Sequence, residues 1–204
     1  LNDEKVDNSI TGYYVDESIK TVNLPALKKG MNILTVKIPF GKTTNVEYCY
    51  ILGNFNVKVE GYVKTIIEPT NTIGFSSITN QGMPFYGGNI TYKTQIETGD
   101  CSLVIKANNY RGSLVAVDID GKRVGVIAFA PYTLTVDNIK SGKHKIEFTL
   151  FGNRHNTFGA LHNADTAIDW FGPNCWRTVG DAWCYEYKLK DAGIMASPII
   201  QIYE

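Results

Sequence analysis

Residues 113–126 read Ser-Leu-Val-Ala-Val-Asp-Ile-Asp-Gly-Lys-Arg-Val-Gly-Val, two strand-like runs on either side of Asp120-Gly121. Asp-Gly tolerates the positive φ angles of a two-residue turn, so this stretch predicts a tight β-hairpin. Asp118-x-Asp120-Gly121 also resembles half of a calcium loop. The turn is favoured because an EF-type loop needs further oxygen ligands and a distal Glu, whereas here the chain re-enters a strand-like run.

The same alternation extends outward from this hairpin in both directions. Apolar and polar residues alternate over 33–38, 102–106 and 145–150, which places one face of each run in a core and the other in water. Val, Ile, Thr, Tyr and Phe dominate the runs, and Gly, Asn, Asp and Pro separate them. No segment of 12 or more residues shows a helical repeat. The pattern predicts an all-β protein, a sandwich or a barrel.

Composition and charge exclude several classes of protein. The 204 residues are 44% hydrophobic and 20% charged, which is typical of a folded domain or two small ones. Lys and Arg number 20, as do Asp and Glu, and without a basic excess or run we expect no nucleic-acid partner. No apolar stretch reaches the ~20 residues of a membrane-spanning helix. Because Leu1 stands first and no leader follows it, we expect a processed or truncated chain.

The four cysteines do not form a recognisable framework. Cys49, Cys101, Cys175 and Cys184 are spread out and include no CxxC pair. Cys175 and Cys184 are close enough in sequence to pair, and buried free thiols are the alternative. The cysteines therefore leave the compartment open, whether secreted, cell-surface or cytoplasmic.

An internal repeat is anchored on Gly30 and Gly142, 112 positions apart. The matching apolar positions are Val22, Leu24, Leu27, Leu34, Val36 and Ile38 in the first copy and Leu134, Val136, Ile139, Ile146, Phe148 and Leu150 in the second. Such a period indicates a duplicated module. Only 29 residues precede Gly30, against about 70 in the second module before Gly142. We therefore expect residues 1–66 to be the C-terminal part of a truncated sandwich and residues 67–204 a whole one, with a linker near 68–71.

A truncated first module would expose unpaired strand edges. The sequence thus predicts either strands upstream in the native protein or self-association that covers these edges.

Several motifs together resemble a known family. They are Gly-Lys-x-Val-Gly at 121–125, Ala-Pro-Tyr at 130–132, the run 134–139, Ser-Gly at 141–142 and the run 145–150, with 12–16 and 24–32 in the first copy. These resemble galactose-binding-like jelly-roll modules of large glycoside hydrolases, including the sugar-binding domain of family 2 enzymes. The tail, at 151–159, 170–173 and 176–183, resembles the C-terminal region of large bacterial glycosidases. The resemblance implies a galactose-binding-like jelly-roll β-sandwich with an accessory or structural role beside an upstream catalytic domain of the same chain.

The longest stretch without strand-like alternation, 151–186, contains all three tryptophans and many hydrogen-bonding groups. Flat aromatic faces and fixed polar partners are what a sugar site requires. The candidate sugar-binding residues are Asn153, Arg154, His155, Asn156, His162, Asp165, Trp170, Trp176 and Trp183. The structural alternative is equally concrete: tryptophans are largely buried on average, and long loops use polar side chains to satisfy their own backbone.

A metal site and a catalytic site are less favoured by this stretch than a sugar-binding site. His155, His162, Cys175 and Cys184 carry zinc-binding atoms, but their spacings do not match finger or ribbon patterns. The resemblance allows a structural calcium ion and implies no other cofactor. Glycoside hydrolysis needs two facing carboxylates. The acids near the tryptophans are Asp165, Asp169, Asp181 and Glu186.

The sequence therefore favours a non-catalytic, carbohydrate-associated region of a bacterial glycoside hydrolase, whose partners are carbohydrate and the catalytic domain. A structural or adhesion sandwich without sugar specificity is the alternative. An enzyme that uses the acids of the tryptophan-rich loop is the third hypothesis.

Overall fold

The computed structural model describes residues 1–44, 48–167, 172, 175–176 and 178–204. It divides into two compact units, Leu1–Ile51 and Leu52–Glu204. The predicted module boundary at 66/67 stays a prediction.

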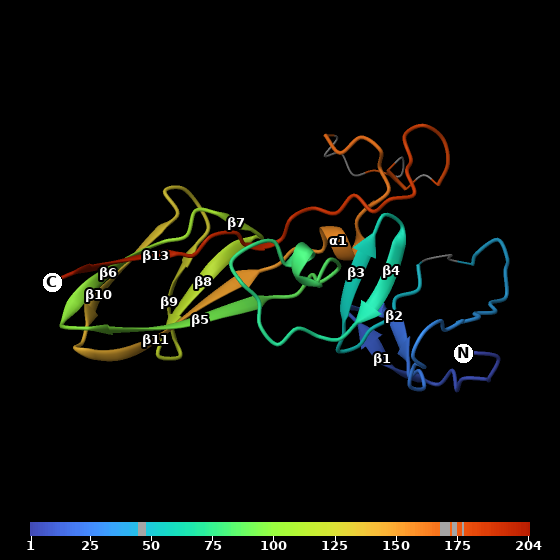
Figure 1. Cartoon of the computed structure of the whole chain (residues 1–204), viewed down its shortest axis with the longest axis horizontal. Coiled ribbons are helices and arrows are strands. Elements are labelled where there is room, and N and C mark those ends of the chain that lie inside the picture. Colours follow the sequence, from blue (N-terminus) through green and yellow to red (C-terminus); the bar gives the residue numbers. More distant parts are fainter. Residues whose placement is uncertain (45–47, 168–171, 173–174, 177) are drawn as a thin grey trace. The chain divides into compact units, whose positions relative to one another are not determined.

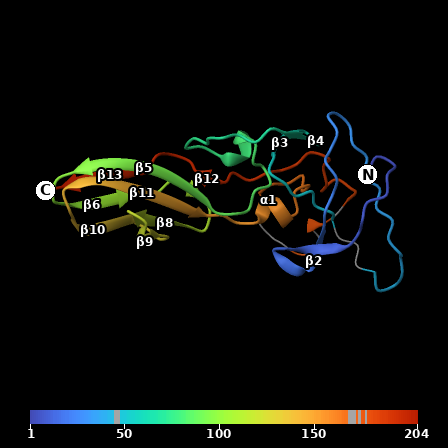
Figure 2. The ribbon, with the colours of Figure 1, turned by 90° about the horizontal axis from the view of Figure 1, so that it is seen from below.

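The second unit is built around two antiparallel sheets (Figure 1). The first has the order β5 (Ile90–Thr98), β11 (Gly142–Phe151), β8 (Leu114–Ile119) and β9 (Lys122–Ile127). The second has the order β10 (Thr133–Ile139), β6 (Cys101–Lys106) and β13 (Ile199–Tyr203). The turned view shows the strands stacked in layers (Figure 2). The all-β sandwich predicted from the alternation is confirmed.

The core lies between these sheets because each strand turns one face inward. In β11 the residues Ile146, Phe148 and Leu150 are buried, and Leu103 and Ile105 of β6 are fully buried with them. The residues between them on β11 face water instead, since side chains alternate across a strand.

Charged pairs cover the outer face of the four-stranded sheet. Glu147 of β11 lies 3.1 Å from Lys93 of β5, and Arg123 of β9 lies 2.9 Å from Asp118 of β8. Each pair joins an exposed basic side chain to a partly covered carboxylate, and these charges keep the outer face polar and leave the inner face as the core.

The hairpin predicted at Asp120-Gly121 is formed. Strands β8 and β9 pair across Asp120-Gly121, whose φ angles are +50° and +79°. Two successive positive φ angles are what a type I′ turn requires. The Asp120 carboxylate accepts a hydrogen bond from the backbone N–H of Lys145 at 2.8 Å, which ties the turn to β11.

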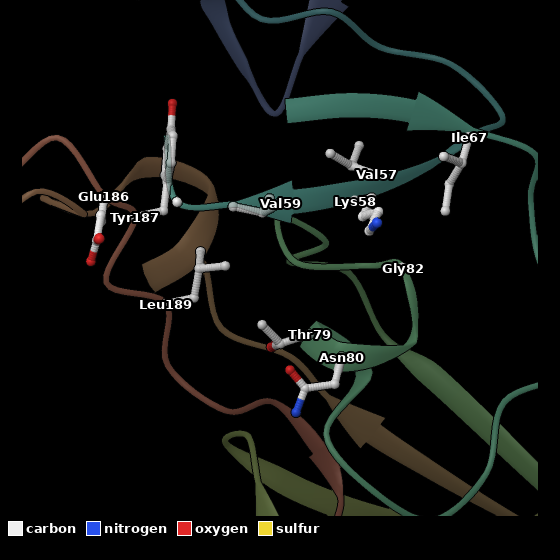
Figure 3. Close-up of a pocket in the computed structure, with 11 residues that line it drawn as sticks. Val57, Lys58, Val59, Ile67, Thr79, Asn80, Gly82, Glu186, Tyr187 and Leu189 are labelled. Carbon is white, nitrogen blue, oxygen red and sulfur yellow. The ribbon is translucent and has the colours of Figure 1, made fainter. Parts of the chain in front are cut away.

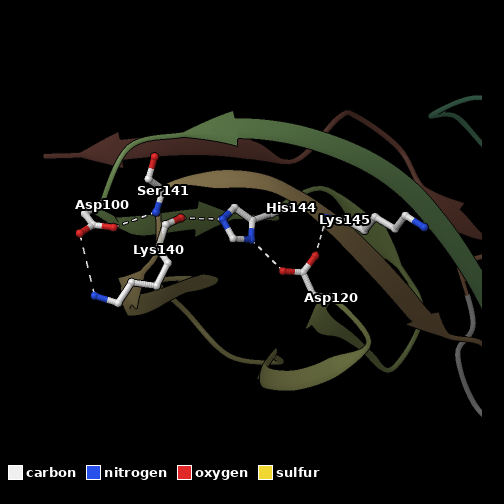
Figure 4. A network of polar contacts seen from close by, with 6 residues as sticks. All are labelled: Asp100, Asp120, Lys140, Ser141, His144 and Lys145. Atoms are coloured by element: carbon white, nitrogen blue, oxygen red, sulfur yellow. Dashed lines mark hydrogen bonds and ion pairs between the residues drawn. The ribbon is translucent and has the colours of Figure 1, made fainter.

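A histidine bridges two turns at the same end of the sandwich (Figure 4). His144 Nδ1 lies 2.7 Å from the Asp120 carboxylate, and its Nε2 lies 2.7 Å from the carbonyl of Lys140. A carboxylate and a carbonyl both accept, so the imidazolium, which donates from both nitrogens, fits this position best. The hydrogen bond to Asp120, then that to Lys140, raises the pKa of His144. The pKa of Asp120 is lowered mainly by the hydrogen bond from His144 and, to a smaller extent, by the hydrogen bond from the Lys145 N–H.

This bridge predicts a pH-dependent stability. Because the pKa of His144 is higher in the folded state than in the unfolded state, its protonation stabilises the fold. This contribution is fully present below the unfolded-state pKa of about 6.5 and is lost as pH rises through the folded-state pKa. The lowered pKa of Asp120 acts in the opposite direction, and its contribution is lost as pH falls below about 3.9. We expect urea denaturation to show higher stability near pH 5.5 than near pH 8.5. His144→Asn should reduce this difference in unfolding free energy between the two pH values. If the variant kept the same difference as the parent, the result would contradict the bridge.

Smaller elements complete the second unit at the end of the sandwich away from the C-terminus (Figure 1). They are the hairpin of β3 (Asn56–Glu60) and β4 (Val63–Ile67), the 3-10 turn η1 (Ile78–Gln81), the pair β7 (Tyr110–Arg111) and β12 (Gly193–Ile194), and the helix α1 (His155–Phe158). The helical segments η1 and α1 are each four residues long, as expected from the lack of helical periodicity.

The first unit contains one hairpin, of β1 (Ile10–Tyr14) and β2 (Asp16–Val22). Among its described residues, none is buried. The prediction of a strand over 33–38 is wrong, since these residues form no regular strand. In the predicted repeat, the counterpart of 33–38 is β11, which lies between β5 and β8, whereas no described strand pairs with 33–38. Gly30 and Gly142 nevertheless share positive φ angles, +94° and +147°.

None of the four cysteines forms a disulfide, so no bond joins Cys175 to Cys184. Within the described ranges, no helix has the length and apolar character to cross a bilayer.

Candidate functional site

Two extended segments of the tryptophan-rich region pair with each other. The N–H of Cys184 donates to the His162 carbonyl at 2.8 Å, and Asn163 and Trp183 form an antiparallel bridge. The N–H of Lys188 donates to the Leu161 carbonyl at 2.7 Å. This pairing gives the loop a strand-like backbone that holds side chains in a fixed order.

The pairing brings four rings together: His162, Trp183, Tyr185 and Tyr187, named here the aromatic ledge. Trp183, Tyr185 and Tyr187 follow one another at every second position, with a bend at residues 185–186, and ring contacts join them to His162 and to one another. The ring centroids of Trp183 and Tyr185 lie 4.4 Å apart in an edge-to-face arrangement, and those of His162 and Tyr187 lie 4.5 Å apart. The His162 ring lies 5.8 Å from that of Trp183, which links the two pairs.

The inner end of the ledge is fixed to the β3–β4 hairpin. Lys64 Nζ lies 4.8 Å from the centre of the Tyr187 ring and donates to the Tyr187 hydroxyl at 2.9 Å. The edge of Phe85 also contacts this ring, with centroids 5.4 Å apart. A cation over an aromatic face is attracted by the ring quadrupole. Tyr187 therefore has packed faces, whereas Tyr185 at the outer end is 72% exposed.

A pocket of about 520 Å³ lies between β3, η1 and the segment that carries Tyr187 (Figure 3). Val57, Val59 and Leu189 give its wall an aliphatic part, but more of the wall is polar than apolar. Asn80 of η1 and Glu186 add polar groups. The pocket therefore offers a mixed, mainly polar surface, and the ledge offers an exposed ring face next to it.

Among the predicted site residues, Asn156 has a clear structural role. It is buried at 6% exposure, its amide N–H donates to the Lys190 carbonyl at 2.7 Å, and its carbonyl accepts from the Lys190 N–H at 3.0 Å. This two-pronged contact ties α1 to the segment that follows the ledge. Asn153 and Arg154 are exposed before α1, and His155 is the half-buried first residue of that helix.

The other predicted residues are spread along the loop. His162 and Trp183 belong to the ledge, and the His162 Nδ1 lies 3.1 Å from the Cys184 carbonyl. Asp165 is exposed and accepts the N–H of Ala167 at 2.8 Å. Trp176 is 47% exposed. Trp170 lies outside the described residues. The sugar-binding assignment of all nine residues stays a prediction.

Of the four acids of this region, Asp169 lies outside the described residues, and the other three are on the surface. Asp165, Asp181 and Glu186 are exposed, and Glu186 lies 3.2 Å from Lys188. The general acid of a glycosidase needs surroundings that keep it protonated, such as an apolar pocket. In the described part of the chain, no three His, Cys, Asp or Glu side chains form a cluster that could hold a metal ion.

Sequence reasoning missed Tyr185, Tyr187 and Lys64. The signal for the first two was present: Trp183-x-Tyr185-x-Tyr187 has the period of a strand. Lys64 could not have been found this way, because its contact with Tyr187 joins residues 123 positions apart.

Of the three comparisons with known proteins, the one with solved structures gave matches. No family model matches the chain, and neither does any curated protein. Two similar structures are a GH2 β-galacturonidase from Eisenbergiella tayi bound to galacturonate and one bound to glycerol. They are 18% and 19% identical over 47% and 52% of this chain, with TM-scores of 0.33 and 0.35.

A third is a rhamnosidase from Novosphingobium sp. PP1Y, 16% identical over 72% of this chain with a TM-score of 0.44. The chain spans 17%, 18% and 14% of these three proteins, respectively, less than a fifth of each. By their names, these three proteins are glycosidases, and this chain matches a small part of each.

Proposed function

We propose that this chain is a non-catalytic, carbohydrate-associated region of a glycoside hydrolase, and that sugar binds at the outer end of the aromatic ledge. The observation that carries the proposal is the exposed Tyr185 ring held edge-to-face against Trp183 at 4.4 Å. A supported, exposed ring offers a flat apolar surface without the entropy cost of ordering a free side chain. Exposed acids beside the ledge supply hydrogen-bond acceptors for hydroxyls but lack the buried setting of a catalytic pair.

The structural alternative has its own support. Asn156 uses its whole amide on the Lys190 backbone, and Tyr187 is held by Lys64. These contacts stabilise the loop whether or not a sugar binds. A structural or adhesion module would need them and would not need Tyr185.

Titration of the 204-residue chain with galacturonides, rhamnosides, galactosides and glucosides tests the proposal. We expect binding to one of these classes and a loss of about tenfold in affinity for Tyr185→Ala, because the stacking surface is removed. The unfolding midpoint should stay within a few degrees of the parent. Phe129→Ala is the matched control, since Phe129 is also an exposed aromatic, at 85%, on the β9–β10 loop; its affinity should not change.

Two outcomes contradict the proposal. One is that no sugar of the four classes produces heat or shifts ligand resonances at millimolar concentration. The other is that Tyr185→Ala lowers the unfolding midpoint by many degrees while the variant, measured where it is still folded, keeps the parent's affinity, which would make the ledge a structural feature.

A further inference from the structure

Strand β4 forms an open sheet edge. All five of its residues are exposed, among them the apolar Val63, Ile66 and Ile67. The other edge of this two-stranded sheet is occupied: the N–H of Val57 donates to the Gly82 carbonyl at 2.8 Å, and the Tyr187 N–H donates to Gly61 at 3.2 Å. An exposed apolar edge is a template for another strand.

The turn of the hairpin determines which backbone groups of β4 point outward. Glu60 and Val63 flank a two-residue turn in which Gly61 has a φ of +62°. Bonded and non-bonded pairs alternate from that closing pair, so the free N–H and C=O groups belong to Lys64 and Ile66. Val57, which pairs with Ile66, confirms the alternation, because its own N–H leaves the sheet.

Strand β4, as described, lacks the features that usually keep an edge strand from pairing with another chain. Its register with β3 is regular, without a bulge, and it contains no proline. A lysine normally protects an edge by keeping its charge in water. Here the Lys64 ammonium is instead held at the Tyr187 hydroxyl, 2.9 Å away.

We propose that β4 pairs antiparallel with β4 of a second copy of this chain, about a two-fold axis at Thr65. This inference goes beyond the proposed function and does not depend on it. In that register Lys64 lies opposite Ile66 of the other copy, and Val63 lies opposite its Ile67. No like charges face each other, and Thr65 meets itself. The outward groups of Lys64 and Ile66 then bond each other across the axis, which satisfies all four in each copy.

The size of this interface sets the expected strength. Five residues per copy bury less surface than the roughly 1,200 Å² of a standard interface, so the dimer is weak. We expect a dissociation constant on the order of 10–100 μM, in the range of transient complexes. Two joined copies would present two ledges, so a multivalent glycan would bind with avidity.

Sedimentation velocity of the full chain from about 5 to 500 μM, the range that brackets such weak dimers, tests the proposal. Ile66→Pro removes an outward N–H while leaving the bonds to β3, and it should weaken the dimer about tenfold or more. Ile66→Val keeps the N–H and is the matched control, with no expected change. Thr65→Lys places two lysines opposite each other at the axis and should also weaken the dimer. Circular dichroism and thermal melting show whether each variant is folded.

Cross-linking tests the register. Non-bonded antiparallel pairs have Cα atoms about 4.5 Å apart, within disulfide range. In a Cys49→Ser background, which removes the exposed native thiol, Thr65→Cys should form a disulfide-linked dimer under mild oxidation. Val63→Cys should not link to itself, but a mixture of Val63→Cys and Ile67→Cys chains should link.

Three results would overturn the proposal. The first is a chain that stays monomeric up to 500 μM, the upper limit of the weak-dimer range, without cross-linking through Thr65→Cys. The second is a dimer unaffected by Ile66→Pro and Thr65→Lys in folded variants, which would place the contact elsewhere, as on the exposed first unit. The third is efficient self-linking of Val63→Cys, which would indicate another register.

Discussion

Phe148→Ala is expected to lower the free energy of unfolding by about 3–5 kcal/mol. Phe148 is 2% exposed at the centre of β11, where its neighbours across the sheet are Tyr92 on β5 and Val117 on β8. All three belong to the core cluster. Removing a ring there leaves a cavity, because strands paired on both sides cannot move inward to close it.

This loss is a large part of the total free energy of unfolding of an ordinary domain, which is about 5–15 kcal/mol. Urea denaturation followed by far-ultraviolet circular dichroism measures it, with the slope against urea concentration expected to stay constant. Phe129→Ala makes the same chemical change at an exposed position and should alter stability by less than about 0.5 kcal/mol. A Phe148→Ala loss below about 1 kcal/mol, the level of an average substitution, would show that this sheet face is not the packed core.

Asn156→Ala is expected to cost about 2–4 kcal/mol, because two hydrogen bonds are lost at a buried site. The Asn156 amide both donates to and accepts from the backbone of Lys190, at 2.7 and 3.0 Å. Without it, the segment after the ledge loses its attachment to α1. Asn153→Ala is the control, since Asn153 is exposed and accepts one local bond from the His155 N–H; its effect should lie within about 0.5 kcal/mol.

Asn156→Asp separates the donor from the acceptor. A carboxylate keeps the acceptor for the Lys190 N–H but offers no proton to the Lys190 carbonyl, and it adds a charge at a buried position. At neutral pH this variant should be at least as unstable as Asn156→Ala in urea. Protonation restores a donor, so part of the loss should be recovered as pH falls. Equal stability of parent and Asn156→Asp at pH 7 would contradict the contact.

The fold could be predicted from local pattern because the strands of the second unit are regular in sequence. The alternation over 102–106 and 145–150 appears in β6 and β11, and Asp120-Gly121 forms its turn, because period two and turn chemistry are properties of neighbouring residues. The candidate site could be predicted only in part. The aromatic content of 151–186 was visible, but the roles of Asn156 and Tyr187 depend on Lys190 and Lys64, which pattern does not connect to them.

The sequence by itself determined the all-β class, the period of each strand and the glycine turns, since these follow from the conformational preferences of adjacent residues. It did not determine which alternating runs become strands. Residues 33–38 carry the same pattern as β11, yet only β11 lies between two neighbours, β5 and β8. A strand is stable only when its backbone groups find partners and its apolar face is covered, and both conditions come from residues distant in the chain. The tertiary structure therefore decided where the core lies, which rings form the ledge and which edge, β4, is left open.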